Sequence, residues 1–181
     1  MNRSHCAFFA MGLMLCPEIN ASADDLAYNL EFTGTIVAQT CDMDISSLSQ
    51  SIDLGRFAVG DFPSTGTTTK FKPFNINLKN CSRGIAGAKI WFTGEPDPDN
   101  PALLAITDTG MGSGSMLASG VGVEILDENQ DIVNINNADS VVYPLKAGRN
   151  TLSFYIRYKS TRPMVTSGNA TAVMYFDMQY E

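Results

Sequence analysis

The sequence is poor in histidine, in basic residues and in long apolar runs. Its one histidine, His5, lies near the N-terminus, so the rest of the chain cannot supply a Ser-His-acid catalytic set. The chain has 12 Lys and Arg against 19 Asp and Glu, and it lacks the excess of positive charge that binding to a nucleic acid backbone requires. These shortages argue against a triad hydrolase and against a nucleic acid-binding protein.

The first 23 residues have the pattern of a secretory signal peptide. Arg3 precedes the short apolar run "CAFFAMGLMLC", and the small-residue sequence "ASA" ends at Ala23. This predicts export and cleavage after Ala23, which leaves enough chain for one domain. A membrane anchor is the alternative, although the apolar run is too short to cross a bilayer. Losing Arg3 and Glu18 leaves the net charge at −7 and removes the histidine.

Two cysteines, Cys41 and Cys81, remain after cleavage. In an exported protein two cysteines usually form a disulfide, and closing a loop of this size stabilises the fold by about 4 kcal/mol. The alternative is two free thiols. Two cysteines without a histidine cannot supply the four ligands of a structural zinc site. We therefore expect a Cys41–Cys81 disulfide, no metal and no cofactor.

The predicted mature sequence has the pattern of β-strands throughout. Short runs rich in Val, Ile, Phe, Tyr and Thr are separated by clusters of Gly, Pro, Asn, Asp and Ser. Seven or so strands with one disulfide predict a β-sandwich of the immunoglobulin type. Trp91 is expected to fill the core beside the disulfide. The expected strands are 26–38, 51–57, 71–79, 87–93, 120–126, 131–135, 151–159 and 170–180.

Two alternating segments do not fit a closed sandwich. The last expected strand has a single charge, Asp177, and no proline, so nothing protects its free edge against pairing. One side of it carries Ala170, Ala172, Met174, Phe176, Met178 and Tyr180. The other segment lies ahead of Cys41, and Gly34 interrupts its apolar side, as glycine does where another backbone approaches closely. That side carries Tyr28, Leu30, Phe32, Gly34, Ile36 and Ala38.

The order of these features resembles the chaperone–usher pilins, which are structural subunits of type 1-like fimbriae in Gram-negative bacteria. Gly34 lies seven residues ahead of Cys41, and an "F-x-P-F-x-I-x-L-x-x-C" stretch ends at Cys81. Gly168 is fourteenth from the end, and Tyr180 is the penultimate residue. The resemblance implies an all-β, incomplete immunoglobulin-like sandwich that lacks its last strand and has an N-terminal donor-strand extension. The implied parts are a signal peptide (1–23), the donor-strand extension (24–39) and a pilin domain (40–181).

The resemblance also implies a non-catalytic function in cell adhesion. A periplasmic chaperone would fill a groove beside the last strand, and at the outer-membrane usher the extension of the next subunit would replace it. The fimbria on the cell surface would then be a head-to-tail polymer, with any host receptor bound through the fibre tip. The implied donor residues are Tyr28, Leu30, Phe32, Gly34, Ile36 and Ala38. The implied groove and chaperone-binding residues are Gly168, Ala172, Met174, Phe176, Met178, Tyr180 and Glu181.

Three alternatives stay open on the sequence alone. The first 16 mature residues could fold back as an ordinary first strand of their own sheet. The chain could instead be a minor subunit at the fibre tip that binds a sugar or receptor, although tip adhesins of this kind usually carry a separate lectin domain and no donor extension. The third alternative is an unrelated secreted β-sandwich that folds alone.

Overall fold

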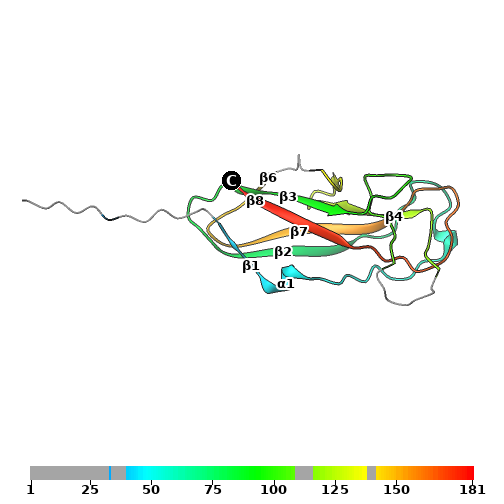
Figure 1. The fold of residues 1–181 in the computed structure, drawn as a ribbon, viewed down its shortest axis with the longest axis horizontal. Helices are drawn as coiled ribbons and strands as arrows, with labels where there is room; N and C mark the ends of the chain where they lie inside the picture. Colours follow the sequence, from blue (N-terminus) through cyan, green and yellow to red (C-terminus); the bar gives the residue numbers. More distant parts are fainter. Residues whose placement is uncertain (1–32, 34–39, 109–115, 138–141) are drawn as a thin grey trace, which may run out of the picture. The chain divides into compact units, whose positions relative to one another are not determined.

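The computed structural model describes residue 33 and residues 40–108, 116–137 and 142–181 (Figure 1). The chain divides into two compact units, Met1–Ile36 and Val37–Glu181, and all the elements below belong to the second. They are β1 (Asp42–Met43), α1 (Ile45–Leu48), a 3-10 turn (Val59–Asp61), β2 (Lys72–Cys81), β3 (Gly87–Gly94), β4 (Val121–Leu126), β5 (Ile132–Val133), β6 (Val142–Pro144), β7 (Gly148–Ser160) and β8 (Met174–Tyr180).

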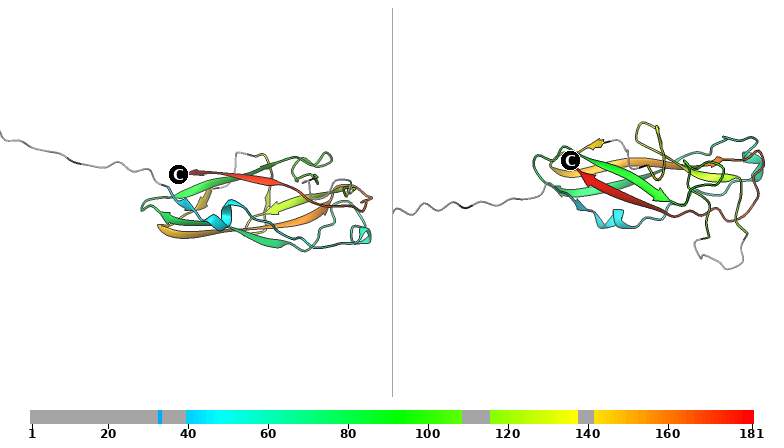
Figure 2. Two further views of the ribbon diagram at one scale, coloured as in Figure 1. Left: turned by 60° about the horizontal axis from the view of Figure 1, so that its bottom comes forward. Right: turned by 45° about the horizontal axis from the view of Figure 1, so that its top comes forward.

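The strands form two antiparallel sheets that enclose the core. The larger sheet has the order β1-β2-β7-β4-β5, and the smaller sheet has the order β6-β3-β8. Figure 2 shows the two layers, with β8 beside β3 at the margin of the smaller sheet. This arrangement confirms the predicted all-β, immunoglobulin-like sandwich with an open edge.

The core lies between the inner faces of the two sheets. Ile76, Phe92 and Phe154 have no solvent-exposed surface. The ring of Phe92 packs edge-on against Phe154 at a centroid distance of 5.0 Å, and Phe74 stacks on Phe154 at 5.4 Å. Because Phe92 comes from β3 and Phe154 from β7, this aromatic cluster joins the two layers directly.

The expected strand at 51–57 is wrong, because this segment turns. The Asp53 side chain accepts a hydrogen bond from the Gly55 N–H at 2.9 Å, and Gly55 has a φ of +99°, which a residue with a side chain rarely adopts. Only Leu54 is buried in the core. The expected strand at 131–135 is also shorter, since β5 has only two residues.

One expected loop, residues 136–150, contains strand residues at two places. β6 lies within the region expected to be a loop and pairs with the start of β3. β7 begins at Gly148, three residues earlier than expected, because Gly148 pairs with Cys81 at the end of β2. The sequence "KAGRN" has low β-propensity, so the start of this strand could not be predicted from it and depends on tertiary pairing.

Trp91 does not fill the core, contrary to the expectation. Its neighbours Ile90 and Phe92 face inward and are fully buried, so the alternation of β3 places Trp91 on the outer face. There it is half-buried, and its register partner on β8 is Asp177. The disulfide between Cys41 and Cys81 is present as predicted. In the described part of the chain, no helix is long and apolar enough to cross a membrane.

Candidate functional site

The last strand, β8, has a hydrogen-bonded neighbour on one edge only. It pairs with β3 from Ala88↔Tyr180 to Gly94↔Met174. Among the described residues, no strand is hydrogen-bonded to its other edge. A free, extended edge with a single charge, Asp177, is a ready template for pairing with another chain.

The inward-facing side chains of β8 are only half-buried. Phe176 and Met178 pack against the core, yet neither reaches the burial of Phe154 or Ile156, which take the same inward orientation on β7. The outward-facing residues of β8 are exposed, and Tyr175 keeps 67% of its surface accessible. The alternation predicted for this strand is therefore confirmed, but the core beneath it is not closed.

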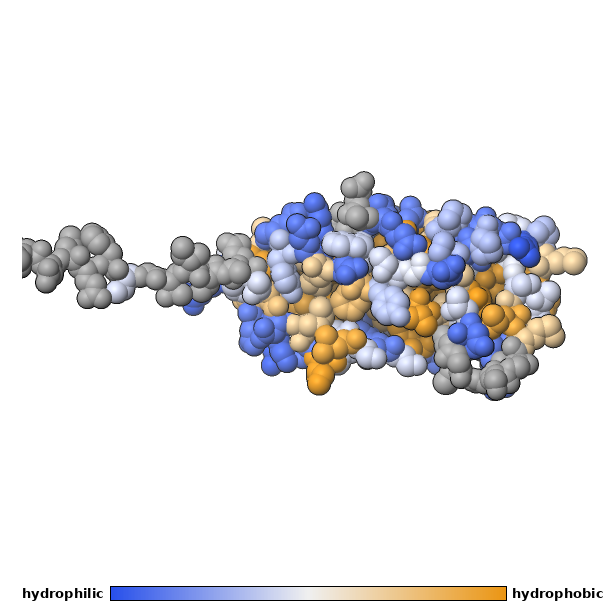
Figure 3. Space-filling view, in the orientation of Figure 1, coloured by the Kyte–Doolittle hydropathy of each residue, from blue (hydrophilic) through white to orange (hydrophobic). Residues whose placement is uncertain are grey.

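The segment that carries β1 and α1 has a second row of incompletely covered apolar side chains. Cys41, Met43 and Ile52 are half-buried against the core, and Ile45 and Leu48 of α1 are 79% and 66% exposed. Figure 3 shows apolar surface in the region between β8 and α1. We call this surface the acceptor face, and its members are Cys41, Met43, Ile52, Ala170, Ala172, Met174, Phe176, Met178 and Tyr180.

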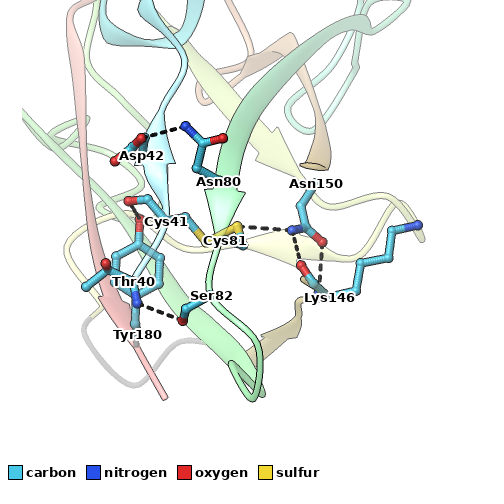
Figure 4. The surroundings of a disulfide bond; sticks show 9 residues. All are labelled: Thr40, Cys41, Asp42, Asn80, Cys81, Ser82, Lys146, Asn150 and Tyr180. Atoms are coloured by element: carbon cyan, nitrogen blue, oxygen red, sulfur yellow. Dashed lines mark hydrogen bonds between the residues drawn. A yellow bond between two sulfur atoms is a disulfide. The ribbon is translucent and has the colours of Figure 1, made fainter. Parts of the chain in front are cut away.

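At one end of the acceptor face, the end of β8 is fastened to the start of the domain. The Tyr180 hydroxyl donates a hydrogen bond to the Cys41 carbonyl oxygen at 3.1 Å (Figure 4). Burial raises the pKa of Tyr180, so the hydroxyl stays protonated and able to donate throughout the neutral range. Thr40 exchanges hydrogen bonds with Ser82, and the Cys41–Cys81 disulfide adds a covalent link. These contacts fix the position of Thr40 and Cys41 at the end of β8.

The C-terminal residue, Glu181, lies at the same end. Its carbonyl oxygen accepts hydrogen bonds from the N–H groups of Ala86 and Gly87, at 3.0 and 3.4 Å. Its side chain lies 3.2 Å from the Lys89 ammonium group. Because both groups of this ion pair are more than a third exposed, the pair orients the terminus more than it stabilises the fold.

Gly168 contacts a neighbouring loop and lies outside β8. A Cβ at this position would lie 2.4 Å from the Met116 carbonyl oxygen and 2.4 Å from the Leu117 carbonyl carbon. Only glycine therefore fits, because both obstructing atoms belong to backbone. The Asn169 N–H bonds the Met116 carbonyl at 2.8 Å, which anchors the segment that leads to β8.

The expected strand 170–180 is correct only from Met174 onward. The Ala170 carbonyl accepts a hydrogen bond from the Tyr158 hydroxyl, and Thr171 exchanges hydrogen bonds with Thr107 at 2.7 and 2.8 Å. These contacts anchor Ala170 and Thr171, and residues 170–173 have no register partner on β3. Ala170 and Ala172 nevertheless share the half-buried side of the acceptor face, as the alternation predicts.

The six expected donor residues lie outside the described residues, and the structure does not test them. They are Tyr28, Leu30, Phe32, Gly34, Ile36 and Ala38. The expected groove residues Ala172, Met174, Phe176, Met178 and Tyr180 do come together on the acceptor face. Sequence reasoning missed the row made by Cys41, Met43 and Ile52, which lacks an alternating pattern.

Sequence reasoning also missed a buried ion-paired cluster on the larger sheet. Glu124 of β4 is fully buried, and its carboxylate lies 2.6 Å from both Arg157 and Lys159 of β7. It faces away from the core, on the side of β4 opposite Val123 and Ile125. The sequence pattern that could have predicted this cluster is a single carboxylate in an otherwise apolar strand, together with two cations at alternate positions of another strand. In the described segments, no group of three or more metal-binding side chains occurs.

Residues 30–181 match a protein-family model described as "Fimbrial protein". An uncharacterized fimbrial-like protein of Escherichia coli K12, YcbU, is 44% identical over 154 residues, covering 84% of each chain. The type 1 fimbrial subunit of Salmonella typhimurium is 36% identical over 84% of this chain and 82% of its own.

Solved structures show the same likeness. A type I fimbria protein and antigen of Burkholderia pseudomallei is 34% identical, with a TM-score of 0.59 over 77% of this chain and 88% of its own. The P pilus rod subunit PapA has a TM-score of 0.64 over 78% of this chain and 99% of its own. At 22% identity, PapA supports the fold alone.

Proposed function

We propose that this chain, which belongs to the fimbrial protein family and is a structural subunit of a cell-surface fimbria, polymerises by donor-strand exchange. The exchange takes place across the acceptor face. Neighbouring fimbrial subunits are its partners in the polymer. The observation that carries the proposal is the free edge of β8 above an incompletely buried inner face. Both defects are removed at once by one added strand, which supplies backbone hydrogen bonds to the edge and apolar side chains to the face.

Residues 24–39 of the next subunit have the composition that this face requires. Leu30, Phe32 and Ile36 alternate with polar residues, and burying such side chains contributes roughly 1.5–3 kcal/mol each. Gly34 lies among them, where the absence of a side chain permits close approach of the two backbones. The disulfide and the Tyr180–Cys41 hydrogen bond hold one end of the acceptor face in place before the strand arrives.

Before assembly, the same surface needs a temporary cover. We propose that residues 1–23 direct export, that a periplasmic chaperone adds a strand to β8, and that the outer-membrane usher exchanges this strand for residues 24–39 of the next subunit. The exposed edge of β8 supports this order, because an uncovered apolar edge strand promotes aggregation. Sequencing the N-terminus of the exported protein tests the cleavage, which we expect to leave Asp24 as the first residue.

A matched pair of substitutions in the donor segment tests the polymerisation. Phe32→Asp places a charge on the apolar side, whereas Thr33→Asp places the same charge on the opposite side. We expect the Phe32→Asp subunit to remain monomeric or chaperone-bound and the Thr33→Asp subunit to form fibres, as seen by electron microscopy and size-exclusion chromatography. Equal fibre formation by both variants would contradict strand donation by this segment.

A further inference from the structure

A basic hollow lies where β6 meets β7. Its volume is about 590 Å³, and it is lined by Pro144, Leu145, Lys146, Arg149, Asn150 and Thr151. Lys146 and Arg149 are both exposed. Among the described residues, no carboxylate lies within 4.0 Å of either cation. Within the described segments, the hollow therefore offers two exposed cations that have no carboxylate within ion-pair distance.

The turn that carries these cations is firmly held. The Asn150 side-chain amide donates hydrogen bonds to the Cys81 sulfur at 3.2 Å and to the Lys146 carbonyl at 2.7 Å, and its oxygen accepts the Lys146 N–H at 3.0 Å (Figure 4). The disulfide thus anchors the backbone of the turn. A fixed backbone lowers the entropy cost of binding a ligand there.

The hollow lies at the same end of the domain as the last residues of β8. The Leu145 N–H bonds the Ala86 carbonyl at 3.1 Å, and the Ala86 N–H bonds the Glu181 carbonyl at 3.0 Å. β6, β3 and β8 are successive strands of one sheet with a spacing of about 4.8 Å. A strand added to the free edge of β8 would therefore lie about 14 Å from β6.

The length of the donor segment determines which residues reach this end. Building on the proposed strand exchange, we take the added strand to run antiparallel to β8, as all strand pairs in the two sheets do. The donor domain begins at residue 40, so residues 30–39 lie opposite positions 171–180, and Leu30, Phe32 and Ile36 face inward beside Tyr180, Met178 and Met174. The remaining residues 24–29 extend beyond Tyr180 and can span about 20 Å, which exceeds the separation from β6.

These six residues begin with two carboxylates, Asp24 and Asp25. We propose that Asp24 and Asp25 of the incoming segment form ion pairs with Lys146 and Arg149 of the accepting subunit. The opposite charges match, and the chain length permits the contact. The pairs fix the register of the added strand, because a shift by one residue would move the carboxylates and turn every donor side chain to the opposite face.

The test uses oligomers of the mature chain, residues 24–181. The variants are Asp24→Asn with Asp25→Asn, Lys146→Gln with Arg149→Gln, and all four changes together. The control is Lys70→Gln with Lys72→Gln, which removes two exposed cations from a region outside the hollow. Dissociation rates are measured at about 0.05 M and about 0.5 M salt, since salt screens exposed pairs.

At low salt we expect each double variant to dissociate roughly three- to tenfold faster than the parent chain, and the fourfold variant no faster than either. The control should match the parent, and high salt should remove the differences. Effects that multiply in the fourfold variant, or that appear equally in the control, would overturn the ion pairs. If the parent itself forms no oligomer that depends on Phe32, the strand exchange fails as well, which separates the two proposals.

Discussion

The stability cost of replacing Phe176 by alanine depends on whether another strand covers the acceptor face. Phe176 is half-buried on the inner side of β8, opposite Phe92 of β3. Replacing a fully buried phenylalanine by alanine costs about 3–5 kcal/mol, so in an uncovered subunit we expect Phe176→Ala to cost about half of this, near 2 kcal/mol. Once a donated strand completes the burial, the full cost applies. The difference of about 1.5–2.5 kcal/mol belongs to strand binding and weakens it roughly 10- to 60-fold.

The assay compares urea unfolding in two states of the mature chain. The uncovered state is a Phe32→Asp subunit, and the covered state is the oligomer of the parent chain. Tyr175→Ala is the control, because Tyr175 is 67% exposed on the outer side of the same strand and should change stability by less than about 0.5 kcal/mol in both states. An equal loss from Phe176→Ala in the two states would refute the reasoning, because it would mean that nothing covers this side chain during assembly.

Three further changes test the disulfide, the close backbone contact at Gly168 and the burial of Tyr143. Replacing Cys41 and Cys81 by serine opens a loop of 40-residue separation and should lower the free energy of unfolding by about 4 kcal/mol in urea titrations, with no further loss on adding reductant. Gly168→Ala should cost about 1–3 kcal/mol through the backbone clash with Met116 and Leu117, whereas Gly60→Ala, with no atom within 4 Å, should be tolerated. Burial, with Asp127 and Glu128 adding smaller effects, raises the pKa of Tyr143 to about 12. The stability that this tyrosine confers is complete below about pH 10 and falls by roughly 2–3 kcal/mol as the pH rises to about 12. The urea concentration at the unfolding midpoint should therefore fall less between about pH 9 and about pH 11 in the Tyr143→Phe variant than in the parent chain.

The sequence predicted the elements whose patterns are local. β2, β3, β4 and β8 have alternating or uniformly apolar runs, and each was expected within a few residues of its observed bounds. The expected strand at 51–57 failed because a single buried residue, Leu54, sits within a turn made by Asp53 and Gly55. β6 was missed because its three residues become a strand only through their pairing with β3.

The candidate site was likewise predicted only where its sequence pattern is local. The alternation from Ala170 to Tyr180 identified one side of the acceptor face, because a period of two residues reflects the backbone alone. The other side depends on the Tyr180–Cys41 hydrogen bond and on the core contacts of Met43 and Ile52, which join residues far apart in the chain. Trp91 shows the same limit, because a composition typical of the core did not reveal which face of β3 it occupies.

In the proposed strand exchange, adding a strand to β8 requires little rearrangement of the accepting subunit. β8 is already ordered by seven register pairs with β3, and its two ends are held by Glu181 and by the contacts of Ala170 and Thr171. The opposite side is held by the disulfide and by Asp44, whose side chain accepts the Ser46 N–H at the start of α1. Since the accepting side is fixed beforehand, the main ordering cost of association falls on the donor segment. Substitutions that stiffen residues 24–39 in an extended conformation should therefore strengthen the fibre more than substitutions that further stabilise β8.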